Sequence, residues 1–303
     1  MNVHAPIPTA SLARRPRRRS REDLEQWITR YRESVGPSSD HCVSLLQTLF
    51  DAGALDEITI DLLLELLETL EPLLADPVTI SCAIAHAATV GGHDLKDILD
   101  DLPKSVRHQL DDLEKLKHYE SGQADSGTER SAEGLRRLLL ALVKDVRVVL
   151  IDLSLQLVLL RHISEDSEEA VNLARETMLI HAPLANRLGI WQLKWELEDL
   201  SFRFLEPEQY RKIANLVAEH RTEREAFIQR FMDKLSAALD EAEIPAEVKG
   251  RPKHIYSIWK KMQRKGLDFH QLFDVRAVRV LVNDLPSCYS ALGLVHTLWQ
   301  PIP

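Results

Sequence analysis

Residues 250–262 read GRPKHIYSIWKKM and residues 273–279 read FDVRAVR, and these two runs decide the architecture of the C-terminal part of the chain. The pattern around them predicts alternating strands and helices, at Ala246–Gly250, His254–Lys265, Val275–Val282 and Ser287–Trp299. Such alternation after Pro245 is typical of a mixed α/β unit.

Basic and hydroxyl side chains recur along the first of these predicted helices. Lys253, Ser257 and Lys261 are spaced by four, so on a helix they share one face and project as a row of donors. Arg251 stands just before the helix, whose N-terminal N–H groups and positive dipole end favour anions. The group predicts a polyphosphate site, and a solvated basic helix balanced by surface acids is the alternative.

Asp274 opens the second predicted strand, where a carboxylate is well placed to bring a metal ion to those phosphates. Arg279 lies five residues further on, so on a regular strand it points to the opposite face from Asp274 unless a bulge intervenes. A single carboxylate before a strand of Val and Arg residues is also common on protein surfaces. The spacing alone leaves both interpretations of Asp274 open.

The composition indicates a globular protein with a sizeable core. Of 303 residues, 45% are apolar and 28% are charged, which suggests roughly two domains. The net charge of −9 argues against a general nucleic-acid binder. Cys42, Cys82 and Cys288 are far apart, which suits a reducing cytoplasm and predicts neither a zinc site nor a disulfide. No apolar run is long enough to span a bilayer, so we expect a cytoplasmic protein without membrane contact.

The first part of the chain begins with a basic arm and continues as helix. Residues 1–19 carry three prolines and a run of arginines, which predicts a disordered and solvated segment, with contact to nucleic acid or an anionic surface as the alternative. Ser20 with Asp23 three residues later is typical of a capping box at a helix start. From there to about Leu239 the apolar spacing is almost entirely helical.

Two details of this helical region lead to specific expectations. Leu135–Ile163 reads as one long buried helix. Glu165–Ile180 reads as an amphipathic helix, and Pro183 is expected to mark a turn after it.

Two further runs are equally distinctive, HAPLANRLGI at residues 181–190 and KWELEDLSF at residues 194–202. Together with the runs at 250–262 and 273–279, they make the chain from about Arg136 onward resemble the RelA/SpoT family of (p)ppGpp synthetases and hydrolases, most closely its RelA branch. Family synthetases are GTP pyrophosphokinases of the stringent response, which transfer pyrophosphate from ATP to the ribose 3′ hydroxyl of GDP or GTP.

The resemblance implies a mostly α fold with a small α/β part at the end. The expected order is a disordered basic arm (1–19), a degenerate HD-type helical domain (20–180), a helical connector (181–240) and the truncated start of an α/β nucleotidyltransferase-like synthetase domain (241–303).

The resemblance also implies roles for the polar residues of the last segment. The ATP-binding group would comprise Arg251, Lys253, Ser257, Lys261 and Arg279. The two guanidiniums would clasp adenine by stacking, and the remaining three side chains would hold the phosphates. Asp274 would bind Mg²⁺, and catalysis would rest on positioning and charge neutralisation.

Some parts of the family's synthetase have no counterpart in these residues. They are a second carboxylate, a tyrosine that stacks on guanine, and the C-terminal regulatory and ribosome-binding domains. We therefore expect this chain alone to bind nucleotide weakly and to be inactive as a synthetase. Contact with the ribosome would require those C-terminal domains in a longer parent protein.

In bifunctional family members the helical half is an HD-type, Mn²⁺-dependent hydrolase, which needs His and Asp ligands and a Glu-Asp pair that activates water. The matching segment, residues 85–92, reads AHAATVGG. Only His86 remains, Ala87 replaces the metal aspartate, and Val90 and Gly91 stand where the acidic pair belongs. A lone imidazole among apolar neighbours is a poor metal site.

A second family motif carries Asp, Arg, His and Asn on one helix, and here it reads DLSLQLVLLR at residues 152–161. Its four polar positions are occupied by Leu155, Gln156, Val158 and Leu159. The resemblance therefore implies a pseudo-hydrolase that holds no Mn²⁺. The alternative to an enzyme portion is a regulatory module that restrains or dimerises the synthetase, as a homo-oligomer, and catalyses nothing.

Overall fold

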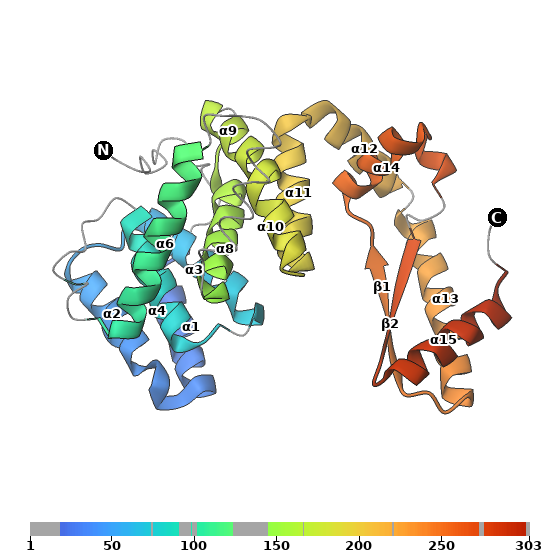
Figure 1. Cartoon of the computed structure of the whole chain (residues 1–303), viewed down its shortest axis with the longest axis horizontal. Helices are drawn as coiled ribbons and strands as arrows, with labels where there is room; N and C mark the ends of the chain where they lie inside the picture. Colours follow the sequence, from blue (N-terminus) through green and yellow to red (C-terminus); the bar gives the residue numbers. More distant parts are fainter. Residues whose placement is uncertain are drawn as a thin grey trace. The chain divides into compact units, whose positions relative to one another are not determined.

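The structure is a computed structural model of the chain, and the residues it describes are 19–73, 75–90, 98, 102–123, 145–165, 167–219, 221–272 and 276–300. The chain divides into two compact units, unit 1 (Met1–Leu205) and unit 2 (Glu206–Pro303) (Figure 1). The mostly α fold class expected from the sequence is confirmed. The limits of the four expected segments stay a prediction.

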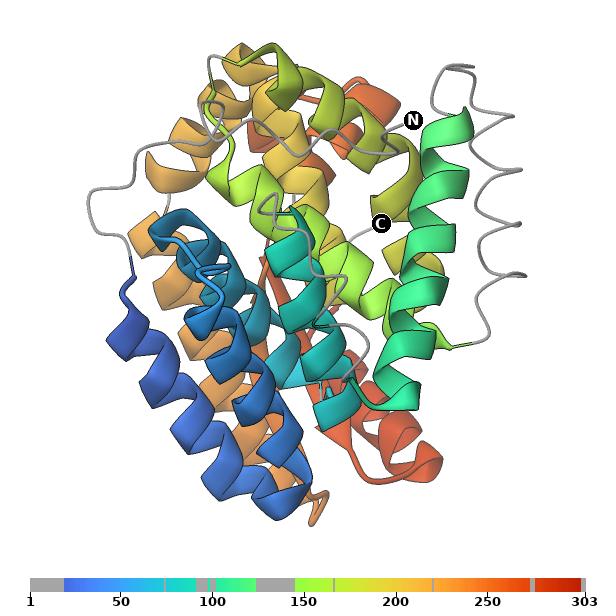
Figure 2. The same cartoon turned by 90° about the vertical axis from the view of Figure 1, so that its left-hand side faces the viewer.

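Unit 1 is built from helices. In chain order they are α1 (Arg21–Val35), α2 (Asp40–Asp51), α3 (Glu57–Leu70), α4 (Pro77–Val90), α6 (Lys104–Gln123), α8 (Val146–His162), α9 (Glu168–Glu176), a π-helical turn (Thr177–His181), α10 (Ala182–Arg187) and α11 (Trp191–Leu205). Figure 2 shows α1 and α2 on one side of unit 1 and α6 on the other. Within the described residues, no helix is both long and apolar enough to cross a membrane.

The core of unit 1 is centred on α3 and α8. α8 packs against α3, α4, α6, α9 and α11. On α3 the leucines recur at helical spacing and are buried, namely Leu62, Leu63, Leu66, Leu67 and Leu70. Burial of this many leucine side chains is the main driving force for the helical packing, because each contributes about 1.5–3 kcal/mol.

The helix starts of unit 1 are set by capping side chains. The capping box expected at Ser20 is confirmed, since the Ser20 N–H donates to Asp23 Oδ2 at 2.7 Å and the Asp23 N–H donates to Ser20 Oγ at 3.3 Å. The long helix expected at Leu135–Ile163 is not continuous, because it is interrupted at Asp145, and its first part (135–144) lies outside the described residues. α8 begins at Val146, because Asp145 has extended backbone and its carboxylate accepts the Arg147 N–H at 3.0 Å.

The turn expected at Pro183 is also wrong, because the chain stays helical from α9 through the π-turn into α10. A proline lacks an N–H, and its ring crowds the carbonyl four residues earlier, here that of Leu179. The backbone responds with a wider turn, in which the Ala182 N–H donates to the carbonyl of Thr177, five residues back. The proline is thus accommodated inside a helix.

Unit 2 is a small α/β unit. Its elements are α12 (Pro207–Glu219), α13 (Arg221–Glu241), β1 (Ala246–Pro252), α14 (Ile255–Lys265), β2 (Arg276–Val282) and α15 (Leu285–Leu298). β1 and β2 pair antiparallel. α13 and α15 pack on the two strands, and α12 packs on α14. The alternation of strands and helices expected after Pro245 is therefore confirmed.

Gly250 marks a close approach between β1 and α13. A Cβ atom at this position would lie 2.9 Å from Ile228 Cγ2 and 3.3 Å from Met232 Sδ. The glycine that opens the GRPKH run therefore matters for packing, because a Cβ there would force either β1 or the Ile228 side chain to shift.

Candidate functional site

The antiparallel ladder of unit 2 brings basic positions of β1 and β2 together. Lys249 is the cross-strand partner of Arg279, and Arg251 is the partner of Ala277. Cross-strand partners lie on the same face of a sheet, so positions 249, 251 and 279 share one face. The other face carries Val248 and Val280, which pack against α13 and α15. The basic face is therefore the one that these two helices leave uncovered.

Lys249 belongs to this group, although sequence reasoning missed it. Its Nζ lies 2.7 Å from Glu247 Oε1, and both side chains are exposed. The signal was available, because residues 247, 249 and 251 alternate with the apolar positions of the predicted strand. Arg279 is exposed as well.

The row of donors expected on one helix face is wrong for Lys253. β1 continues to Pro252 and α14 begins only at Ile255, so Lys253 lies in the two-residue link between them. Proline at 252 favours extended backbone before it and ends the strand without starting the helix. Ser257 and Lys261 do lie on α14, four residues apart on one face, and both are half-buried.

The opposite face of α14 is anchored in a small core. Ile258 is fully buried and packs with Ile213, Phe269 and Leu272. This packing fixes which way the helix faces, and it leaves Ser257 and Lys261 away from the core. The helix N-terminus directly follows Lys253, so its dipole adds to the positive charge of that side chain. The arrangement can hold an anion of several negative charges.

The expected metal residue Asp274 lies outside the described residues, and so does Gly91. The relation of Asp274 to Arg279 therefore stays a prediction. In the described ranges, which omit 91–97 and 273–275, no group of three or more His, Cys, Asp and Glu side chains lies close enough to hold a metal ion.

The described positions that the resemblance assigns to hydrolase motifs lie on α4 and α8. Ala87 is buried on α4 next to the half-buried His86, and Val90 packs against the core at the end of that helix. On α8, the side chains of three of the four positions are apolar and buried, namely Leu155, Val158 and Leu159. This face of α8 is part of the hydrophobic core.

Gln156 is the polar member of that face, and it contacts the π-turn. The side chain is buried, and its Nε2 donates to Thr177 Oγ1 at 2.9 Å. Thr177 Oγ1 in turn donates to the carbonyl of Leu173 at 2.7 Å. A buried amide requires such partners, because an unsatisfied one costs about 1–3 kcal/mol.

Asp152 is a charged residue buried in the same core, one helical turn before Gln156. Its carboxylate has no exposed surface and pairs with the Lys117 ammonium from α6, while Asp152 Oδ2 lies 3.4 Å from His181 Nε2. Burial alone would raise the pKa of Asp152, but the ammonium and the imidazole outweigh it and hold that pKa below its usual range. The carboxylate is therefore ionised and compensated inside the protein.

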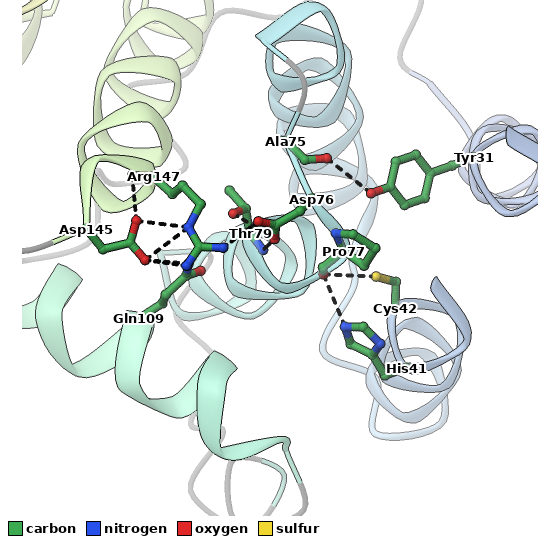
Figure 3. Close-up of polar contacts among 10 residues, drawn as sticks. All are labelled: Tyr31, His41, Cys42, Ala75, Asp76, Pro77, Thr79, Gln109, Asp145 and Arg147. Atoms are coloured by element: carbon green, nitrogen blue, oxygen red, sulfur yellow. Dashed lines mark hydrogen bonds and ion pairs between the residues drawn. The ribbon is translucent and has the colours of Figure 1, made fainter. Parts of the chain in front are cut away.

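A second polar cluster connects the N-terminal ends of α4 and α8 (Figure 3). The Arg147 guanidinium contacts Asp76 and donates through Nε and Nη2 to Asp145, at 2.9 and 2.6 Å. Gln109 of α6 donates to Asp145 Oδ2 at 3.1 Å, and Asp76 accepts the Thr79 N–H at 2.9 Å. Hydrogen bonds from Arg147 are the largest cause that lowers the pKa of Asp145 to about 2.

The same cluster reaches α1 and α2 through the backbone before α4. Tyr31 donates to the carbonyl of Ala75 at 3.2 Å, and Cys42 Sγ donates to the carbonyl of Pro77 at 3.2 Å (Figure 3). His41 Nε2 lies 3.2 Å from that same carbonyl. The cluster braces four helices around the start of α4, which indicates a structural role.

Unit 1 also contains a cavity of about 480 Å³ between α3, α8 and α11. Its charged lining is largely paired. Arg161 contacts Glu65 at 3.0 Å and also contacts Glu196, and Arg19 contacts Glu68 at 2.7 Å. These pairs satisfy the guanidiniums within the wall, so the cavity offers a ligand little uncompensated charge.

Comparison with known proteins places this arrangement in a family. Residues 33–191, more than half of the chain, match the HD domain family, and residues 250–303 match the region found in RelA and SpoT proteins. The chain belongs to the RelA/SpoT family. The second match covers the whole run from Gly250 through α14, β2 and α15, which carries the basic positions described above except Lys249.

The curated relatives of this RelA/SpoT chain are named either as GTP pyrophosphokinases or as a pyrophosphohydrolase. A GTP pyrophosphokinase of Escherichia coli K12 is 43% identical over 244 residues, which are 79% of this chain and 33% of the relative. One of Haemophilus influenzae is 48% identical over 197 residues, 64% of this chain and 26% of the relative. A probable guanosine-3′,5′-bis(diphosphate) 3′-pyrophosphohydrolase of Synechocystis is 39% identical over 248 residues, 77% of this chain and 32% of the relative. The chain spans about a third of these relatives or less.

Proposed function

We propose that this chain is a portion of a stringent-response enzyme that makes (p)ppGpp by transferring pyrophosphate from ATP to the 3′ hydroxyl of GDP or GTP. The similarity to relatives named GTP pyrophosphokinase supports the reaction. The family match over residues 250–303 supports unit 2 as the part that binds nucleotide.

In this proposal the uncovered face of β1 and β2 receives ATP. The observation that carries it is the ladder, which puts position 251 and Arg279 on one face, as an adenine held between two guanidiniums requires. Lys253, Ser257 and Lys261 would hold the phosphates, helped by the N-terminus of α14. Asp274 would bring the Mg²⁺ that neutralises the charge of the triphosphate.

Titration calorimetry with ATP and Mg²⁺ tests the site directly. We expect weak binding by the chain, and a loss of about tenfold in affinity for Lys253→Ala, Lys261→Ala or Asp274→Ala, since each removes a charge-assisted contact. Lys260→Ala is the matched control, because Lys260 is exposed and adjacent to Lys261 on the same helix but lies over the Tyr256 ring. The site assignment is excluded if Lys260→Ala weakens binding as much as Lys261→Ala.

We further propose that the chain alone makes no product from ATP and GDP or GTP, because the family's second carboxylate and guanine-stacking tyrosine have no match in its residues. A radiolabelled phosphate-transfer assay on residues 1–303 tests this point. Formation of ppGpp would mean that a residue of this chain supplies the second carboxylate.

For unit 1 we propose a pseudo-hydrolase that binds no Mn²⁺. The apolar and buried side chains at Ala87, Leu155, Val158 and Leu159 support this proposal, since none of them can ligate a metal. Incubation with ppGpp and Mn²⁺ should release no pyrophosphate. Release of pyrophosphate would overturn the pseudo-hydrolase assignment.

A second candidate function is a regulatory module that restrains or dimerises a synthetase. The replacement of the hydrolase positions by core residues favours it, because the domain persists without the polar side chains of the reaction. Sedimentation of residues 1–303 distinguishes a homo-oligomer from a monomer. We place the parent protein in the cytoplasm, with ribosome contact through domains outside this chain.

A further inference from the structure

Two polar contacts from one face of α8 reach the two ends of the π-turn. Asp152 and Gln156 are four residues apart on α8 and point the same way. Gln156 Nε2 donates to Thr177, the first residue of the turn, at 2.9 Å. Asp152 Oδ2 lies 3.4 Å from Nε2 of His181, the last residue of the turn. The spacing of the two contacts on α8 thus matches the length of the turn.

The π-turn needs such support, because its backbone is not the preferred one. Pro183 has no N–H, so the preceding turn lacks one α-helical hydrogen bond. The Ala182 N–H donates instead to the carbonyl of Thr177, five residues back. The Thr177 hydroxyl donates to the carbonyl of Leu173 at 2.7 Å, a contact that tends to bend helices. A π-turn and an α-helical turn differ by one residue in register. If the π-turn became an α-helical turn, the helix that follows it would therefore shift.

The charged contact is entirely buried. Asp152 and His181 have no exposed surface, and the Lys117 side chain that pairs with Asp152 is 15% exposed. A buried carboxylate is strongly destabilising once its partner moves away. His181 is therefore held at one place against α8, which a loosely packed apolar contact would not achieve.

We propose that Lys117, Asp152 and Gln156 form a clamp on Thr177 and His181 that holds the π-turn, and so fixes the direction in which α10 and α11 leave α9. The clamp is a conformational device at the start of the HAPLANRLGI run, built on the face of α8 where hydrolase relatives would carry their polar motif. It rests on the contacts of unit 1 and is independent of nucleotide binding in unit 2.

Hydrogen–deuterium exchange of the whole chain tests the clamp. Gln156→Leu removes the donor to Thr177, and we expect the amides of residues 178–187 to exchange about tenfold faster, the equivalent of one lost hydrogen bond. The control is Gln109→Leu. Gln109 is equally buried at 3% exposure and donates one hydrogen bond between helices, but its acceptor is Asp145 and not a residue of the π-turn. This control should leave residues 178–187 unchanged.

The double variant Lys117→Met/Asp152→Leu tests the charged half. Because both charges leave together, we expect it to stay folded and to show the same local increase in exchange around His181. Equal exchange of residues 178–187 in the two glutamine variants would overturn the proposal. So would wild-type protection of this segment in the double variant, or an increase spread evenly over α1–α4.

Discussion

Asp152 contributes to stability only while its two partners stay in place. Removing the ammonium alone, as in Lys117→Met, leaves a carboxylate without exposed surface and should destabilise the fold by about 3–5 kcal/mol. Adding Asp152→Leu removes the uncompensated charge and should recover most of that loss. Urea unfolding followed by circular dichroism measures both variants, and equal stabilities of the single and double variants would contradict the pairing.

The carboxylate of Asp145 makes the stability of unit 1 depend on pH in the acidic range. Its pKa is about 2, below the ordinary 3.8, chiefly because Arg147 donates hydrogen bonds to it. A lowered folded-state pKa gives stability that is present above about pH 4 and is lost as the pH falls towards 2. Asp145→Asn should therefore cost about 1 kcal/mol at pH 7, discounted for solvent screening. Melting curves from pH 7 to pH 2 should show the two proteins converging, and a constant difference would refute this linkage.

The residue types of both candidate sites could be recognised in the sequence, but their surroundings could not. The apolar residues Leu155 and Val158 can be read directly from the sequence, and their burial agrees with the expected filled core. The role of Asp152 was missed, because its partners Lys117 and His181 are 35 and 29 positions away and come from other helices. A charge at core spacing on an apolar helix was the available signal.

At the scale of elements, Gly250 controls how closely β1 approaches α13. Gly250→Ala places a Cβ 2.9 Å from Ile228, so we expect about 1–3 kcal/mol of destabilisation from overpacking. Gly293→Ala is the matched control, since a Cβ in the middle of α15 meets no atom within 4 Å and alanine favours helix by about 1 kcal/mol. Thermal unfolding should move in opposite directions for the two variants. A loss of stability in both would argue against the close approach.

Rules of local sequence correctly predicted the helix and strand starts that depend on one or two side chains. Ser20 and Asp23 cap α1 as expected, and the strand at Ala246 begins where the alternation begins. The same rules failed at Pro183 and Lys253. In the first case the surrounding helices retain a π-turn, and in the second the pairing of β1 with β2 extends the strand to Pro252. Both failures are cases of tertiary contacts overriding local propensity.

At the scale of the whole molecule, unit 1 has a hydrophobic core of its own. The buried cluster that contains Leu24, Leu63 and Leu197 draws its members from residues before Glu206. We therefore expect residues 1–205 expressed alone to fold, with helical circular dichroism and a cooperative urea transition. A broad transition with strong binding of a hydrophobic dye would mean that unit 1 depends on unit 2.

The three thiols of the chain differ in accessibility, since Cys288 is exposed on α15 whereas Cys42 and Cys82 are buried in unit 1. Burial raises the pKa of Cys42 to about 11 and that of Cys82 to about 12, so at neutral pH neither forms the reactive thiolate. A maleimide dye should attach once per molecule, as intact mass spectrometry would verify. The unmutated chain therefore already carries an attachment point for a fluorescent reporter in unit 2, and a second adduct would signal that unit 1 has opened.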